Sequence, residues 1–258
     1  MSEYITIEDR GVVRWLRLDA PDRKNAIPED GWEPLAQALD DFDASDQRVL
    51  VVAGRGSDFC AGADLSDVAV AESAWVNAQR MAGPNAAAMA LHRVAKPTIA
   101  AVDGVAVGAG MNLALGCDLI VATDRARFAE IFVRRGLTLD FGGSWLLPRV
   151  VGLAKARELA LTGRFLDAAE AEALGIVARV VASEDLVGAV TDLADELAAG
   201  APLAQLFIKR ALDRSATMTF EQALAFEEQS QAILLGSRDV REAAAAFGDK
   251  RDPRFTGT

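Results

Sequence analysis

Two loops of small residues are the part of this chain whose residue types could do chemistry. They are residues 59–65, Phe-Cys-Ala-Gly-Ala-Asp-Leu, and residues 104–110, Gly-Val-Ala-Val-Gly-Ala-Gly. Small side chains let backbone N–H groups approach a ligand closely, so the two loops could direct two N–H groups at one point. Such a pair is an oxyanion hole, which stabilises negative charge on a carbonyl oxygen. The reaction would then depend on the acid or base that faces the hole.

Asp140 is the candidate for that acid or base. It lies within residues 136–145, a stretch that is otherwise apolar and rich in glycine. One interpretation makes it the N-cap of a helix that begins near Gly142 or Gly143. The other makes it a proton-transfer group, because a carboxylate in apolar surroundings holds its proton more tightly. Composition alone leaves both interpretations open.

Several other chemistries lack their residues in this sequence. The third glycine of a dinucleotide-binding G-x-G-x-x-G motif would fall at Leu113, and neither a phosphate-binding Gly-Lys-Ser/Thr loop nor a Gly-x-Ser-x-Gly elbow occurs. The one histidine, His92, has apolar neighbours typical of a helix face, and we expect it to pack rather than to catalyse. A zinc site would need His92, Cys60 and Cys117 to converge from distant positions. We therefore expect no metal site and no separate cofactor.

Composition narrows the partners and the compartment. The 258 residues carry a net charge of −11, which argues against a nucleic-acid partner. No apolar run approaches the roughly 20 residues of a membrane-spanning helix, and the first residues lack the pattern of a signal peptide. Two cysteines do not indicate a disulfide framework and favour a reducing compartment. These observations predict a soluble, cytoplasmic protein without a membrane partner.

The pattern of apolar residues predicts an α/β fold with a largely parallel sheet, because buried strands alternate with helical segments. Trp32, Leu35, Leu39 and Phe42 recur at helical spacing after an acidic stretch. The other expected elements are a pair of strands within residues 5–7 and 12–18, buried strands at 49–53, 98–102 and 119–122, a helix at 86–94 and a short strand at 178–181.

Helical patterns dominate after about residue 143, and Ala201-Pro202 marks a boundary. We divide the chain there into a core of residues 1–200 and a helical region of residues 201–258. The second region is expected to form helices at 203–212, 220–234 and 240–247. It has few apolar residues of its own, so it should pack on the main body or on a neighbouring subunit.

The two loops resemble the oxyanion-hole loops of the crotonase (enoyl-CoA hydratase/isomerase) superfamily, with residues 101–110 as the second loop. The resemblance covers nearly the whole chain. It implies a spiral of ββα units, a helical C-terminal region that mediates trimer formation, and coenzyme A thioester substrates, with a homotrimer or a dimer of trimers as the assembly. The matching segments after the loops are residues 117–120, Phe128, 142–143, 147–149, 161–163, 168–175, Phe247 and 250–251.

The resemblance also implies roles for individual positions. The backbone N–H groups of Ala63 and Ala109 would form the hole, and the adenine would lie near Ala61 and Asp64. A basic pair would lie beside the pantetheine and phosphates, where positive charge meets phosphate directly, although a solvated basic turn is the alternative. Two C-terminal residues would reach coenzyme A on the same or an adjacent subunit. These two pairs are Arg23 with Lys24, and Phe247 with Lys250.

The reaction is the point at which this chain departs from the hydratases it resembles. They use two glutamates to activate water, and the matching positions here are Asn112 and Phe132, neither of which can act as a base. Glu130 lies two residues from the second position and is expected to point elsewhere. Hydration by the usual route is therefore not expected.

Asp140 matches the aspartate of PaaG-type ring-epoxide and enoyl-CoA isomerases. It also matches the nucleophile of 4-chlorobenzoyl-CoA dehalogenases, but the histidine that they use is replaced here by Asn85. We predict an acyl-CoA isomerase in which Asp140 moves a proton while the hole holds the enolate. Apolar walls would strengthen this base, and we expect them from Phe132, Phe141 and Trp145. The alternatives are hydration with Asp140 alone as the acid–base group, and a catalytically silent protein that binds acyl-CoA.

Overall fold

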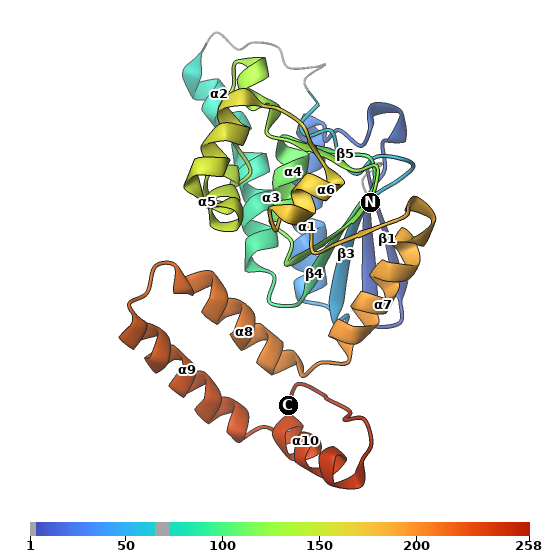
Figure 1. Cartoon of the computed structure of the whole chain (residues 1–258), viewed down its shortest axis with the longest axis vertical. Coiled ribbons are helices and arrows are strands. Elements are labelled where there is room, and N and C mark those ends of the chain that lie inside the picture. The colour runs from blue at the N-terminus through green and yellow to red at the C-terminus, as the bar shows by residue number, and fades with distance from the viewer. Residues whose placement is uncertain (1–3, 65–72) are drawn as a thin grey trace.

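A mixed sheet forms the centre of the molecule (Figure 1). The computed structural model describes residues 4–64 and 73–258, and Leu65, the last residue of the first loop, lies outside them. In the described residues this sheet has the strand order β1-β2-β3-β4-β6-β9, with β1 antiparallel to β2 and the other neighbours parallel. The strands are β1 (Ile5–Arg10), β2 (Val13–Leu18), β3 (Val49–Gly54), β4 (Thr98–Val102), β6 (Leu119–Thr123) and β9 (Arg179–Val181).

The inner strands β3 and β4 of this sheet are buried on both faces, which explains their continuous apolar runs. In β3, Leu50 and Val52 join the larger hydrophobic core, whereas Val49 and Val51 join a second core on the other face. Helices α1 (Trp32–Asp43), α3 (Ala82–Arg93) and α4 (Ala109–Leu115) cover the first face, and α7 (Leu186–Ala198) covers the second (Figure 1). The predicted α/β class and parallel strands are confirmed.

A second, smaller sheet supports the two small-residue loops. Its order is β5-β7-β8, with β5 (Val105–Val107) parallel to β7 (Arg127–Ala129) and β7 antiparallel to β8 (Leu166–Asp167). An isolated bridge joins Cys60 of the first loop to Ala106 of β5. The loops are therefore held side by side by backbone hydrogen bonds.

The remaining elements connect these layers. Helix α5 (Gly143–Thr162) contains a break at Gly152, whose φ of 75° is not helical, so two helical segments follow one another there. The helix predicted at residues 86–94 is part of α3, which begins earlier, at Ala82. The other elements are η1 (Pro21–Arg23), η2 (Glu29–Gly31), α2 (Ala74–Arg80), η3 (Ile131–Arg135), α5 (Gly143–Thr162), α6 (Ala168–Ala173) and η4 (Ser183–Asp185).

The C-terminal region consists of three helices that project from the core (Figure 1). They are α8 (Pro202–Ser215), α9 (Phe220–Leu235) and α10 (Arg238–Asp249), close to the predicted ranges. Lys209 pairs with Asp118 at 2.8 Å, and the Arg48 guanidinium donates to the carbonyls of Ala198 and Phe255. These polar contacts tie the helices to the core, while the division of the chain at residue 200 stays a prediction.

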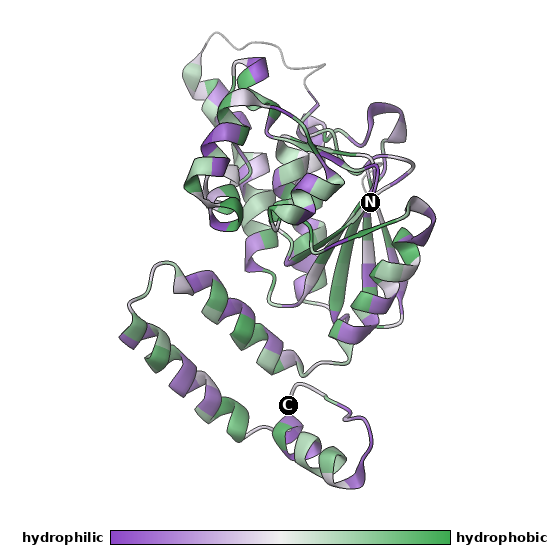
Figure 2. Cartoon of the chain, in the orientation of Figure 1, coloured by the Kyte–Doolittle hydropathy of each residue, from purple (hydrophilic) through white to green (hydrophobic). Residues whose placement is uncertain are grey.

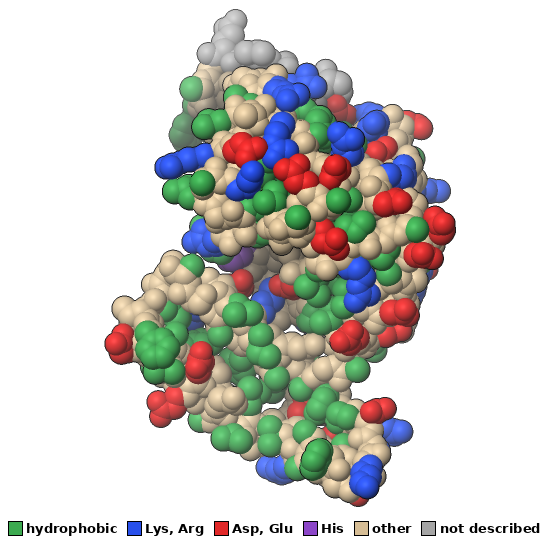
Figure 3. All heavy atoms as spheres, viewed as in Figure 1, with side chains coloured by type: hydrophobic (Ala, Val, Ile, Leu, Met, Phe, Trp, Pro, Cys, Tyr) green, Lys and Arg blue, Asp and Glu red, His purple; other side chains and the backbone are tan. Residues whose placement is uncertain are grey.

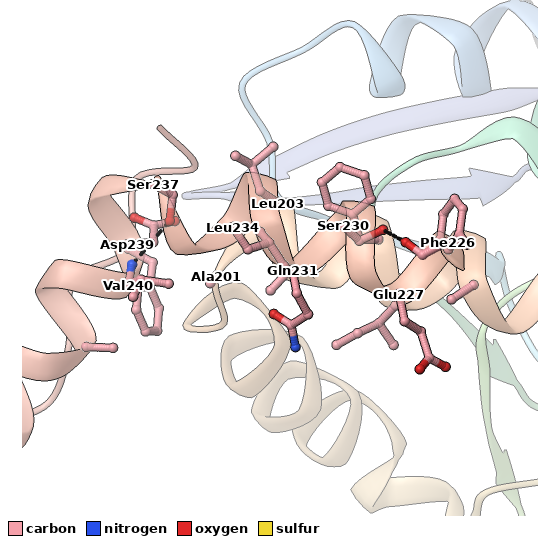
Figure 4. Close-up of a pocket in the computed structure, with 16 residues that line it drawn as sticks. Ala201, Leu203, Phe226, Glu227, Ser230, Gln231, Leu234, Ser237, Asp239 and Val240 are labelled. Carbon is pink, nitrogen blue, oxygen red and sulfur yellow. Dashed lines mark hydrogen bonds between the residues drawn. The ribbon is translucent and has the colours of Figure 1, made fainter. Parts of the chain in front are cut away.

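Apolar side chains on α8–α10 are poorly covered within this chain. None of the residues of α8, all of which are described, is buried, and Leu212 of that helix is 68% exposed. A cavity of about 440 Å³ lies between the three helices, with Leu203, Phe226 and Leu234 among its lining residues (Figure 4). Figures 2 and 3 show the apolar residues along these helices and on their surface. Among the described helices, none is both long and apolar enough to cross a membrane.

Candidate active site

The second loop presents a free backbone N–H at the start of α4. The chain leaves β5 through Gly108, whose φ of 57° is left-handed and favours glycine, and enters α4 at Ala109. The first N–H groups of a helix have no partner within the helix. The N–H of Ala109 donates to no residue that the structure describes.

The first loop places a second free N–H beside it. The bonds from Ile27 N to Gly62 O and from Asp64 N to Ile27 O, both 2.8 Å, flank Ala63 without using its N–H. Within the described ranges that N–H has no acceptor. A Cβ on Gly62 would lie 2.7 Å from the Val107 carbonyl oxygen and 3.4 Å from the Ala109 nitrogen. The peptide that carries the Ala63 N–H thus packs against the Ala109 amide, as an oxyanion hole requires.

Asp140 does not cap helix α5, so that interpretation is wrong. The N-cap is Gly142, with a φ of 83° and no side-chain cap. Instead, the main-chain carbonyl of Asp140 accepts hydrogen bonds from Gly143 N at 2.9 Å and from Asn112 Nδ2 at 3.0 Å. These bonds hold the backbone of Asp140 and do not involve its carboxylate.

The carboxylate of Asp140 is partly buried, and its Oδ1 has no hydrogen-bond partner among the described residues. Burial disfavours the charged form and raises the pKa of Asp140 to about 6. A carboxyl with such a pKa is ionised at neutral pH and is a stronger base than an ordinary aspartate. Asp140 therefore has the properties that a general base requires.

Asn112 joins α4 to the turn before α5. It is completely buried, and its amide nitrogen donates to the Asp140 carbonyl. Gly143 packs directly on this amide, because a Cβ there would lie 2.4 Å from Asn112 Nδ2. The glycine thus permits the approach that fixes Asp140 relative to the hole.

Glu130 was expected to point elsewhere, and this prediction is wrong. Glu130 is only 1% exposed, and its Oε2 lies 3.4 Å from Asn112 Nδ2. The prediction relied on the offset of two residues between Glu130 and the matching position 132, but the chain turns into η3 directly after Glu130, whose φ and ψ are −83° and 71°. A charged residue within the apolar segment 128–132 was the signal in the sequence that could have identified it.

Burial, the largest cause, and the negative charge of Asp140 together raise the pKa of Glu130 to about 8, although the Asn112 hydrogen bond opposes them. The carboxyls of Asp140 and Glu130 thus ionise at different pH values, Asp140 at the lower one. Asp140 loses its proton first, and Glu130 must then ionise against the charge already present. At neutral pH the pair holds one proton, on Glu130.

The three aromatic residues expected to bound the acyl space lie in different surroundings. Phe132 is buried beside the hole, with its ring Cζ 3.6 Å from the Cβ position of Gly108. Phe141, at a φ of 47°, is buried and packs against Trp32, with ring centroids 5.8 Å apart. That its ring also bounds the acyl space stays a prediction.

Trp145, the third residue expected to bound the acyl space, lies on α5, and its role there stays a prediction. Its ring contacts His92, with centroids 5.5 Å apart, and the Arg149 guanidinium lies 3.6 Å from its ring centroid. It lines a cavity of about 450 Å³ between the core and α8. His92 is exposed and packs on this ring.

The residues expected to contact coenzyme A fall into two groups. In the first group, Arg23 pairs with Asp64 at 2.8 Å, and the N–H of Ala61 donates to the carbonyl of Lys24 at 2.9 Å. These four residues therefore gather at the edge of the first loop. The second group, Phe247 and Lys250, lies on or after α10, at the far end of the molecule from the loops (Figure 1). Phe247 is 89% exposed.

No group of three metal-ligating side chains occurs among the residues that the structure describes. The functional groups of the site are thus two backbone amides, two carboxyls and one carboxamide. Such a set of groups is capable of proton transfer next to a stabilised carbonyl oxygen.

Paired backbone amides beside a buried carboxylate, on a parallel sheet followed by projecting helices, define a crotonase-fold protein. Residues 8–258 match the sequence profile of the enoyl-CoA hydratase/isomerase family, and the chain belongs to this family of enzymes.

Relatives with different reactions resemble the chain over its whole length. It is 38% identical to the 1,2-epoxyphenylacetyl-CoA isomerase of Escherichia coli K12, with 100% of both chains covered. It is 37% identical to a probable enoyl-CoA hydratase of Rhizobium meliloti, with 98% of each covered. The crystal structure of an enoyl-CoA hydratase from Polaromonas sp. JS666 superposes with a TM-score of 0.93 at 33% identity, covering 98% of this chain and 99% of that one. The motif resemblance to the isomerase group is confirmed, while the reaction is not decided by these likenesses.

Proposed function

We propose that this protein is an acyl-CoA isomerase that shifts a double bond, or opens a related strained ring, by proton transfer. The observation that carries the proposal is the Asp140 carboxylate. It is partly buried and does not cap helix α5. Its Oδ1 has no hydrogen-bond partner among the described residues, and burial raises its pKa to about 6. The likeness to an isomerase from Escherichia coli supports the same reaction.

The reaction uses the carboxylate and the hole together. The thioester oxygen lies at the N–H groups of Ala63 and Ala109, and Asp140 removes a proton from a carbon of the acyl chain. The electron pair of the broken C–H bond moves into the thioester, whose oxygen gains negative charge that the two amides stabilise. A proton then adds to a different carbon and the double bond has moved. Coenzyme A is part of the substrate, and the reaction requires no separate cofactor.

Asp140→Asn tests the proposal. The amide cannot accept the proton, so kcat should fall by about 10²- to 10⁴-fold. Binding of an acyl-CoA ester, measured by calorimetry, should stay within a few-fold because the hole is unchanged. Asp124→Asn, at an exposed carboxylate, is the control. Near-normal turnover of Asp140→Asn would contradict the mechanism.

Hydration of a 2-enoyl-CoA is the second candidate. It is favoured by the second buried carboxyl, Glu130, which gives the site an acid and a base, and by the relatives named as hydratases. Direct measurement of water addition to a 2-enoyl-CoA separates it from isomerisation. Tight binding without any turnover would instead favour a silent acyl-CoA-binding protein.

We also propose that the protein forms a homotrimer, or a dimer of such trimers, in the cytoplasm. The support is the exposed apolar surface of α8–α10, whose cavity a second copy would cover (Figure 4). In such an assembly Phe247 and Lys250 would contact coenzyme A bound to a neighbouring subunit. Light scattering coupled to gel filtration measures the assembly, and a monomer would contradict it.

A further inference from the structure

Three buried polar atoms in this site lack partners, and they come from three different elements. They are Oε1 of Glu130, before η3, Oδ1 of Asn112, on α4, and Oδ1 of Asp140, before α5. They are the buried side-chain oxygens and nitrogens of the described residues that have no hydrogen-bond partner. Unpartnered buried polar atoms are rare because they lose their bonds to water. The three residues meet at Asn112, whose Nδ2 donates to the Glu130 side chain and to the Asp140 main-chain carbonyl. A molecule bound beside them would complete the bonding of the unpartnered atoms.

Of these groups, Glu130 has no role in the reaction as written above. Its side chain receives one long hydrogen bond, 3.4 Å from Asn112 Nδ2, and Oε1 is left over. Asp140 is the charge that acts on it among the described residues, and no described cation offsets that charge. Such surroundings keep a carboxyl in its protonated form, and a protonated carboxyl is a donor.

The ionisation order divides the roles between the two carboxyls. The pKa of Asp140, about 6, leaves it ionised at neutral pH, and the pKa of Glu130, about 8, leaves it protonated. Pairs whose environments separate their pKa values in this way supply a base and an acid to one reaction.

We propose that Glu130 is a second proton-transfer residue of this site, donating a proton to the acyl chain after Asp140 has removed one. The inference rests on the proposed isomerase function. A C–H bond breaks and its proton goes to Asp140, while the electron pair moves into the thioester enolate. The O–H bond of Glu130 then breaks as its proton forms the new C–H bond. Transfer of a proton from Asp140 back to Glu130 restores the enzyme.

The two-residue reaction differs from a one-base reaction in the origin of the new hydrogen. With one base, the proton that Asp140 removed is the proton it returns. With two residues, the new hydrogen comes from Glu130, whose proton has exchanged with solvent before the substrate binds. Hydrogen isotopes therefore distinguish the two.

The experiment is a single turnover in D₂O, with the enzyme in excess and the deuterium in the product measured by mass spectrometry. The wild-type protein should place one deuterium at the new C–H position in nearly all of the product. In Glu130→Gln the rate should fall by about 10²-fold, and the product that still forms should retain the substrate hydrogen, carried by Asp140 alone. Glu33→Gln, at an exposed glutamate of α1, is the matched control and should behave as the wild type.

Two results would overturn the proposal. One is a wild-type product that mostly keeps the substrate hydrogen, a measurement that needs no variant to fold. The other is a Glu130→Gln protein with a rate within threefold of the wild type and an unchanged deuterium content.

Infrared spectra recorded between neutral and alkaline pH test the proton on Glu130 without turnover. The carbonyl band of a protonated carboxyl should be present at neutral pH, disappear as the pH rises, and be missing from Glu130→Gln. Absence of this band from the wild type would overturn the proposal. If the band is present but no isomer forms, the proposed function fails while the proton-holding role of Glu130 stands, and the isotope comparison moves to water addition.

Discussion

Replacement of Glu130 by glutamine should alter how the stability of the protein depends on pH. Glu130 has a pKa of about 8 in the folded protein, against an ordinary value of 4.5. Because the folded-state pKa is the higher one, its contribution to stability is fully present below about 4.5 and is lost as the pH rises through about 8. The wild type should therefore become less stable, relative to Glu130→Gln, at alkaline pH.

The magnitude follows from the separation of the two pKa values. One pKa unit corresponds to about 1.4 kcal/mol, so the full difference for Glu130 is about 5 kcal/mol. Roughly 4 kcal/mol of this falls between about pH 5 and about pH 9. The carboxyl of Asp140 is present in both proteins, so its own titration largely cancels in the comparison.

The assay is urea unfolding followed by tryptophan fluorescence, at one protein concentration and at both pH values. Glu33→Gln is the control, and its difference from the wild type should change by less than about 0.5 kcal/mol because its side chain is exposed. If the difference between Glu130→Gln and the wild type were the same at both pH values, Glu130 would titrate as it does in water. The reasoning from burial would then be refuted.

Three further predictions concern the hole and the base. Ala109→Pro removes one N–H at the first position of α4, where proline is tolerated, and kcat should fall by about 10²- to 10³-fold; Ala109→Gly, which keeps the N–H, should stay close to the wild type. Gly143→Ala places a Cβ 2.4 Å from Asn112 Nδ2, so we expect kcat to fall at least about tenfold, whereas Gly248→Ala, with open space around its Cβ, is the control. The pH dependence of kcat/KM should rise through about 6 as Asp140 loses its proton, and a flat profile across that range would contradict its role as base.

Local patterns in the sequence were sufficient to predict the sheet and the first helix. Strands β3 and β4 are buried on both faces, so their residues are apolar without interruption and their position is readable. Helix α1 has one buried face, and the predicted residues Trp32, Leu35, Leu39 and Phe42 are the buried ones. The second sheet was not predicted, because its strands are only two or three residues long and carry no periodicity.

The site was harder to predict, since it depends on contacts between distant segments. Small residues indicated where backbone amides are free, and that information is local. The placement of Glu130 depends on an irregular turn before η3, and the orientation of Phe141 on a left-handed φ of 47°. Trp145 contacts His92, which lies more than fifty positions earlier in the chain. No spacing rule within one segment contains such information.

The packing of Gly110 against Cys60 has a consequence for how this chain could change its chemistry. A Cβ on Gly110 would lie 2.3 Å from the Cys60 carbonyl oxygen, so the gap between the two loops is set by direct backbone contact. The position of the two loops, which carry the Ala63 and Ala109 amides, therefore does not depend on the side chains that would determine the reaction. Substitutions at Asn112, Glu130 or Asp140 could exchange one proton chemistry for another while the grip on the substrate stays intact. The reaction on this scaffold can thus change, by evolution or by design, while the two amides that would stabilise an enolate stay in place.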